Sequence, residues 1–146
     1  MFEVLIKKII SILEANTKLS IVYNYEVGEM KGDPAVIVVP SSNESDYNTS
    51  QENIRIYAFN IKVFVKRNLP RKPEDGDRIM REIVSSIIDD FDKDYYFQSG
   101  IVCPTGYTFI NVFAMPSSWG YSGETDEYRV AEINLKCRVS VDLLHI

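Results

Sequence analysis

The sequence predicts an α+β domain, built as a mainly antiparallel sheet of about five strands with two helices packed on it. Three observations lead to this prediction. Two segments carry apolar residues at the spacing of an amphipathic helix, whereas several others alternate as strands do. The strands come in runs rather than singly between helices, which favours antiparallel pairing. Aromatic residues make up 12% of the chain and suit a pleated, half-buried surface.

The elements are expected in the order α-β-β-β-α-β-β within one domain, 1–146. A strand is expected from Ile21 to Val27. The apolar run Ala35–Val39 predicts a buried strand that ends at Pro40, because proline interrupts a strand ladder. The polar stretch Ser42–Asn53 is expected to be a long connection. The first helix is expected to begin the chain, since these apolar residues fall on one side of it: Phe2, Leu5, Ile6, Ile9, Ile12 and Leu13.

The next strand and the second helix have the clearest patterns. An apolar stripe from Ile79 to Phe91 predicts the helix, and Asp75 or Asp77 is expected to cap its start. Residues 54–67 alternate as a strand, with these side chains on the core face: Tyr57, Phe59, Ile61, Val63 and Val65.

Two further strands are expected near the C-terminus. Gly106–Met115 is apolar on both faces and predicts a central strand. The Ser- and Gly-rich stretch Met115–Tyr128 is expected to be a loop before the last strand. In that last strand, alternate residues from Ala131 to Leu143 face the core. Cys137 belongs to this apolar face, where a buried, unreactive thiol is expected.

The sequence lacks the patterns of common catalytic and ligand-binding sites. His145 is the single histidine and lies next to the chain end, so a nucleophile has no well-placed base. Two cysteines without a CxxC spacing do not make a structural zinc site. The acidic run Asp89–Tyr96 does not match a calcium loop, and no glycine-rich phosphate loop occurs. We therefore expect no catalytic residue, no metal and no cofactor.

Charge and hydropathy narrow the function classes further. The net charge of −5 disfavours a protein that grips nucleic-acid phosphates, because such a protein needs clustered lysine and arginine. No segment has the long apolar run of a membrane span.

Six residues are candidates for contacts with other proteins. Trp119 and Tyr121 belong to the expected loop Met115–Tyr128, and Tyr47 belongs to the expected connection Ser42–Asn53. Aromatic side chains in such loops provide large contact areas at small entropic cost. Trp119 has a second interpretation, in which it folds back over the end of its own sheet. The remaining candidates are charged residues on outward strand faces: Lys62, Glu132 and Arg138.

The whole chain resembles the tail terminator, or tail completion, proteins of long-tailed bacteriophages. The resemblance is one of pattern and order. It rests on an opening amphipathic helix followed by strands around a polar stretch, and on a helix followed by two final strands near the C-terminus. It also rests on Glu52–Val65 (ENIRIYAFNIKVFV), which looks like the long central strand of that family.

The resemblance implies a structural virion protein without an active site. Such proteins form a ring, usually of six subunits, at the head-proximal end of the tail tube, after assembly in the host cytoplasm. The ring stops tube polymerisation and offers a surface for head attachment. The implied partners are further copies of the chain, the major tail tube protein and a head-completion or neck protein. DNA passes through the pore without specific binding.

Three alternatives remain at this stage. Neck and head-completion proteins of the same virions share this pattern, so a neck adaptor is one. Another is a monomeric or dimeric binding module whose partner contacts Trp119. An enzyme that uses acidic clusters with a metal is the third, although the acids fall at helix ends and in loops.

Overall fold

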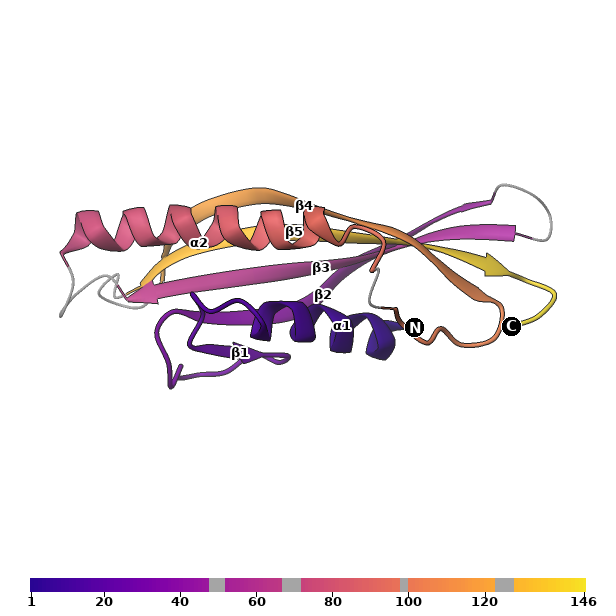
Figure 1. Ribbon diagram of the computed structural model, residues 1–146, viewed down its shortest axis with the longest axis horizontal. Helices are drawn as coiled ribbons and strands as arrows, with labels where there is room; N and C mark the ends of the chain where they lie inside the picture. The colour runs from indigo at the N-terminus through magenta and orange to yellow at the C-terminus, as the bar shows by residue number, and fades with distance from the viewer. Residues whose placement is uncertain (48–51, 67–71, 98–99, 123–127) are drawn as a thin grey trace.

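A computed structural model describes residues 1–47, 52–66, 72–97, 100–122 and 128–146, and shows two helices on one side of a five-stranded sheet (Figure 1). The predicted order of elements is confirmed. In chain order they are α1 (Phe2–Glu14), β1 (Ile21–Tyr23), β2 (Ala35–Tyr47), β3 (Glu52–Lys66), α2 (Pro73–Lys93), β4 (Tyr107–Ser122) and β5 (Tyr128–Asp142).

The strands lie in the order β1-β2-β3-β5-β4. Short β1 is parallel to β2, and every other neighbouring pair is antiparallel, so the mainly antiparallel α+β prediction is confirmed. β4 lies at the edge of the sheet, so the prediction of a central strand over Gly106–Met115 is wrong. Its apolarity on both faces comes instead from exposed side chains, chiefly Phe113 and Met115, which are 46% and 49% exposed.

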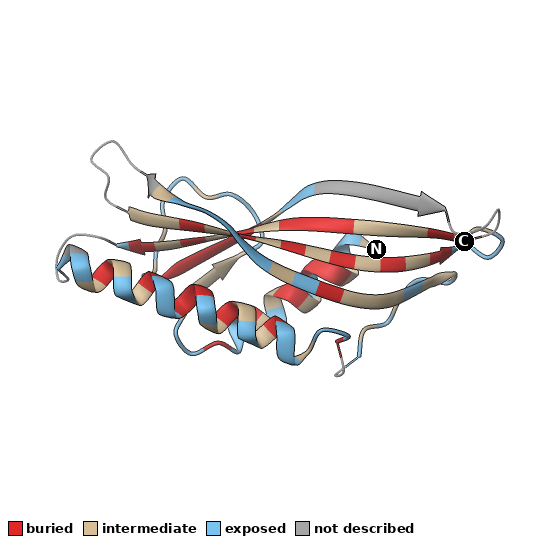
Figure 2. Ribbon diagram, turned by 90° about the horizontal axis from the view of Figure 1, so that it is seen from above, coloured by how far each residue is buried: buried red, intermediate tan, exposed pale blue. Residues whose placement is uncertain are grey.

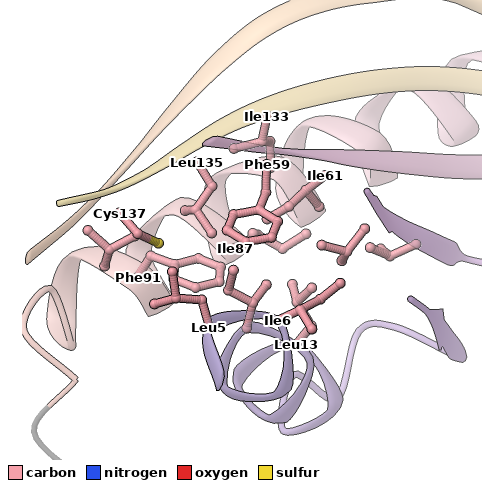
Figure 3. Packing of buried hydrophobic residues seen from close by; sticks show 14 of the residues in the cluster. Leu5, Ile6, Leu13, Phe59, Ile61, Ile87, Phe91, Ile133, Leu135 and Cys137 are labelled. Atoms are coloured by element: carbon pink, nitrogen blue, oxygen red, sulfur yellow. The ribbon is translucent and has the colours of Figure 1, made fainter. Parts of the chain in front are cut away.

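One hydrophobic core lies between the sheet and the two helices (Figure 3). Alternate residues of β3 and β5 point into it as predicted, because successive side chains of a strand face opposite sides. Phe59 and Leu135 from the sheet contact the same cluster as Leu5 of α1 and Phe91 of α2. Cys137 is fully buried in this cluster, and burial raises its thiol pKa to about 12, which makes it the unreactive thiol that was expected.

The β2–β3 hairpin is longer than predicted and extends past the helices (Figure 1). β2 continues through Pro40 to Tyr47, so the predicted strand end and the predicted connection Ser42–Asn53 are both wrong. The register shifts between Pro40 and Asn43. Proline is tolerated there because β1 pairs with β2 only over Ala35–Ile37, which leaves Pro40 on an edge of the sheet. β1 itself ends at Tyr23, four residues before the predicted Val27.

β4 likewise continues through the region expected to be a loop. It reaches Ser122, and Trp119 pairs with Ala131 of β5. The register shifts at two places, between Phe109 and Asn111 and between Pro116 and Ser118. The serines and glycine of this stretch therefore belong to a bulged edge strand, a setting in which such residues are common.

α2 begins at Pro73, earlier than predicted, so that Asp75 and Asp77 lie within the helix rather than before it. Proline suits the first turn of a helix because its fixed φ is already helical and its missing N–H needs no partner there. Lys72 precedes the helix without a side-chain cap, so the prediction that Asp75 or Asp77 caps it is wrong. Asp77 instead lies 3.3 Å from the guanidinium Nε of Arg129 on β5, an ion pair without the alignment of a hydrogen bond.

Candidate interaction surface

One face of the sheet carries no helix, and we call it the open face. It is formed by the side chains of β3, β4 and β5 that point away from α1 and α2, as the alternation of burial along the strands shows (Figure 2). Strand register places the following residues on it: Ile54, Ile56, Ala58, Asn60, Lys62 and Phe64 of β3; Val130, Glu132, Asn134, Lys136, Arg138 and Ser140 of β5; Thr108, Asn111, Phe113 and Met115 of β4.

The open face brings together the three charged residues that the sequence singled out. Lys62 pairs in register with Glu132, but its ammonium group binds Glu26 at 3.1 Å, so Lys62 is already engaged within the chain. The side chains of Glu132, Lys136 and Arg138 make no hydrogen bond or ion pair with any residue that the structure describes. These three half-buried side chains are therefore the charged groups that remain available on this face.

Apolar side chains, some of them exposed, adjoin Lys136 and Arg138. Phe113 pairs with Lys136, and Met115 pairs with the next outward residue of β5, Asn134. Arg138 pairs with Ile56 on its other side. Antiparallel sheets with a solvated face usually carry polar residues there, so an apolar and cationic centre is a departure from that pattern.

The aromatic candidates lie apart from one another. Trp119 is 45% exposed and is not part of the core cluster, although its register partner Ala131 points to the helix side. Tyr47 belongs to the opposite end of the sheet, level with Tyr107 through the shared strand register. The side chains of Tyr47 and Tyr121 fall outside the described part of the structure. Trp119 as a contact residue stays a prediction, as does its alternative role over its own sheet.

The end of α2 presents a second exposed surface, which we call the acidic end of α2: Asp89, Asp92, Tyr95 and Tyr96. The two tyrosine rings meet edge to face at 4.8 Å and are 53% and 43% exposed. Asp89 and Asp92 are exposed and have no partner among the described residues. Asp90, in contrast, accepts a hydrogen bond from buried Asn16 at 2.9 Å.

Sequence reasoning missed several residues of these surfaces. The run DDFDKDYY reads from the sequence as a helix end with solvated acids, with a cation site as the alternative, and neither interpretation points to Tyr95 and Tyr96. Phe113 and Met115 were assigned to a buried central strand. Lys136 could have been found, because the alternation of the last strand places it on the outward face beside Arg138.

The described residues contain few arrangements that could perform chemistry. No group of three or more His, Cys, Asp or Glu side chains in the described ranges has the geometry of a metal site. His145 lies 2.7 Å from Asp142, and this hydrogen bond lowers the pKa of Asp142, but both side chains are exposed near the C-terminus. Neither described helix is long and apolar enough to cross a membrane.

A shallow depression of about 360 Å³ lies between the end of α1 and α2. Its polar groups already satisfy one another, because the Asn16 amide donates to Ser86 Oγ at 3.0 Å and to Asp90. The side-chain Oδ1 of Asn16 accepts from the backbone N–H of Lys18. This network joins the two helices, so the depression has a structural explanation.

Comparison with known proteins gives a likeness of fold. No family model matches the sequence, and no curated protein matches it. Among solved structures, a chain from the "Virion of native gene transfer agent (GTA) particle" matches with a TM-score of 0.59 and 13% sequence identity. The match covers 90% of this chain and 91% of that one. At this identity the likeness shows a shared fold.

Proposed function

We propose that this protein is a structural protein of a phage-like virion and forms a ring, with six subunits as the expected number, at the head-proximal end of the tail tube. The observation that supports it most is the shared fold with a chain of a gene transfer agent virion, over nine-tenths of both chains. The order of elements agrees with the resemblance to tail terminator proteins.

The surface of the chain supports a role in assembly. A ring with cyclic symmetry needs two different patches on each subunit, because each copy meets its neighbours heterologously. The chain has such a pair in the open face and the acidic end of α2. Exposed apolar side chains on the open face are typical of contact surfaces rather than of a solvated sheet.

A non-enzymatic role agrees with the chemistry of the described residues. The Cys137 thiol is buried and protonated at neutral pH, and His145 lies beside a carboxylate rather than a nucleophile.

The proposed partners are further copies of the chain, the major tail tube protein and a head-completion or neck protein. The net charge of −5 suits a pore through which DNA moves without adhering, because few clustered cations are available for phosphates. The proposed location is the head-proximal end of the virion tail.

A tube-capping assay tests this function. Polymerising tail tube protein of the same virus is mixed with the chain, and tube lengths are measured by electron microscopy. The proposal predicts shorter tubes with a ring at one end. Tubes of unchanged length with no bound ring would contradict it, and binding to the head-side connector alone would assign the chain to the neck instead.

The double charge reversal Glu132→Lys and Arg138→Glu should weaken ring formation. Unchanged assembly would exclude a charged interface at these residues.

A further inference from the structure

We propose that, in the ring, the open face of one copy binds the acidic end of α2 of the neighbouring copy. This inference rests on the proposed ring function and adds the two surfaces that meet. It follows from the size and composition of the open face, from the protection of the sheet edges and from charge complementarity.

The open face has the size of a protein interface. Three strands of 15 or 16 residues form it, and at a rise of about 3.3 Å per residue they extend about 50 Å. With strands about 4.8 Å apart, the face covers roughly 700 Å². A specific interface buries about 800 Å² on each partner, so this face alone has nearly the area required.

The composition of the open face favours a permanent partner. Ile54, Ile56, Phe64 and Val130 are partly buried on it, and Phe113 and Met115 are about half exposed. Interfaces between copies of one chain are more apolar than those between transient partners. A second copy of this chain therefore fits the surface.

The two edges of the sheet are protected against pairing with another strand. On one side, β1 covers part of β2, and Pro40 interrupts the row of N–H donors beyond it. On the other, the N–H of Val112 in β4 donates to the carbonyl of Tyr95 at 2.7 Å, and Pro116 with its bulge interrupts the strand. Proline, bulges and covering segments are the means by which proteins block edge-to-edge contacts. The open face, rather than either edge of the sheet, therefore remains available for assembly.

Charge selects the part of the neighbour that docks. Lys136 and Arg138 are two neighbouring cations near the middle of the open face, and neither has a partner among the described residues. Asp89 and Asp92 are exposed carboxylates that lack partners in the same part of the chain. Their tyrosine neighbours supply apolar area that can contact Phe113 and Met115. Paired opposite charges fix the register of an interface more than they raise its affinity.

The rival arrangement is a face-to-face dimer of two open faces. In it, Glu132 of one copy could meet Arg138 of the other, since a two-fold axis near Leu135 exchanges these positions. Such an isologous contact closes at two copies, whereas the contact of the open face with α2 is heterologous and continues around a ring. The two arrangements therefore differ in mass and in their dependence on Asp89 and Asp92.

The test is a charge exchange read by native mass and by negative-stain imaging, with tail tube protein added as a template if rings need one. The double variant K136E/R138E and the double variant D89K/D92K should each raise the protein concentration needed for half-maximal ring formation by about tenfold or more. The fourfold variant that carries both exchanges has the net charge of the original chain and should restore the rings. Matched controls are K7E/K31E and E3K/E14K, which make the same changes of net charge on exposed sites and should leave the rings intact.

The outcomes separate this inference from the function it rests on. Rings that survive both double variants would overturn the proposed contact while the ring function stands. The face-to-face dimer would replace the proposed contact under two conditions. The original chain would form nothing larger than dimers, and K136E/R138E but not D89K/D92K would abolish assembly. Failure of the fourfold variant to restore rings would also overturn the pairing. If the original chain forms no ring even on tail tubes, the proposed function fails together with this contact.

Discussion

The two faces of β5 differ in the burial of their side chains and in whether those side chains have partners within the chain. On the helix side, Ile133, Leu135 and Val139 are completely buried against α1 and α2. On the open side, the alternate residues include Glu132, Lys136 and Arg138, which have no partner within the described chain. One strand thus carries the determinants of folding on one face and free charged groups on the other. Substitutions on the two faces should therefore separate folding from assembly.

The largest expected effect is the protection of the thiol on the covered face. In a Cys103→Ser background, Cys137 should react with a thiol reagent at pH 8 about a thousandfold more slowly in the native protein than in urea. The reason is that the thiol is buried, and its pKa of about 12 keeps it protonated. Rapid labelling of the native variant would show that the core opens easily. The half-buried Cys103, studied in a Cys137→Ala background, is the comparison.

The next effect compares neighbours on β5. Leu135→Ala should lower the free energy of unfolding by about 2–5 kcal/mol, because it leaves a cavity in the core. Lys136→Ala should change it by no more than about 0.5 kcal/mol, because this side chain has no partner in the described structure. Urea unfolding of the two variants measures both values. Similar losses for the two substitutions would remove the distinction between the faces.

A smaller effect is expected from the polar network that joins the two helices on the covered side. Asn16→Ala should lower the free energy of unfolding by about 1–3 kcal/mol, since it removes a buried amide that bonds Ser86, Asp90 and the backbone of Lys18. Thermal or urea unfolding provides the measurement. The exposed neighbour Thr17→Ala is the control and should be nearly neutral; an equal loss there would argue against the network.

A small effect is also expected for the ion pair on the open side. Glu26→Gln should change the free energy of unfolding by less than about 1 kcal/mol, because the Glu26 side chain is 68% exposed and solvent screens the pair. The change should shrink further in 1 M salt. A large loss in thermal unfolding at low and high salt would show that the open face contributes to folding after all.

The elements whose apolar residues repeat regularly could be predicted from the sequence. Both amphipathic helices, the alternation of β3 and β5 and the burial of Cys137 follow from residue spacing, and the structure confirms them. These elements meet a single core, so their apolar residues repeat at the period of a helix or a strand.

Apart from the start and cap of α2, the parts that were predicted wrongly lie at the margins of the sheet. Beyond Pro40, β2 extends past the helices, where the pattern of a covered strand is lost (Figure 1). β4 has apolar residues on both faces as an edge strand, and the serines and glycine around Trp119 belong to its bulged end. An edge strand pairs on one side only, so proline, bulges and polar residues destabilise it little. For this reason its sequence resembles that of a loop.

The residues of the candidate interaction surface also fall into those that could be predicted from the sequence and those that could not. Glu132 and Arg138 could be placed on an outward face because alternation fixes the side of a strand on which a residue lies. The pairing of Lys62 with Glu26 could not be predicted, since it depends on how the β1–β2 connection folds over the sheet. The exposure of Phe113 and Met115 required knowledge that β4 is an edge strand.

Native mass measured across a wide range of protein concentration, with negative-stain images of the same samples and with tail tube protein added, tests the central claim most directly. The proposed function predicts closed rings of about six copies, as the resemblance implies, either free in solution or on tube ends. A particle that stays a monomer or dimer at every concentration, and that leaves the tube ends bare, would contradict it.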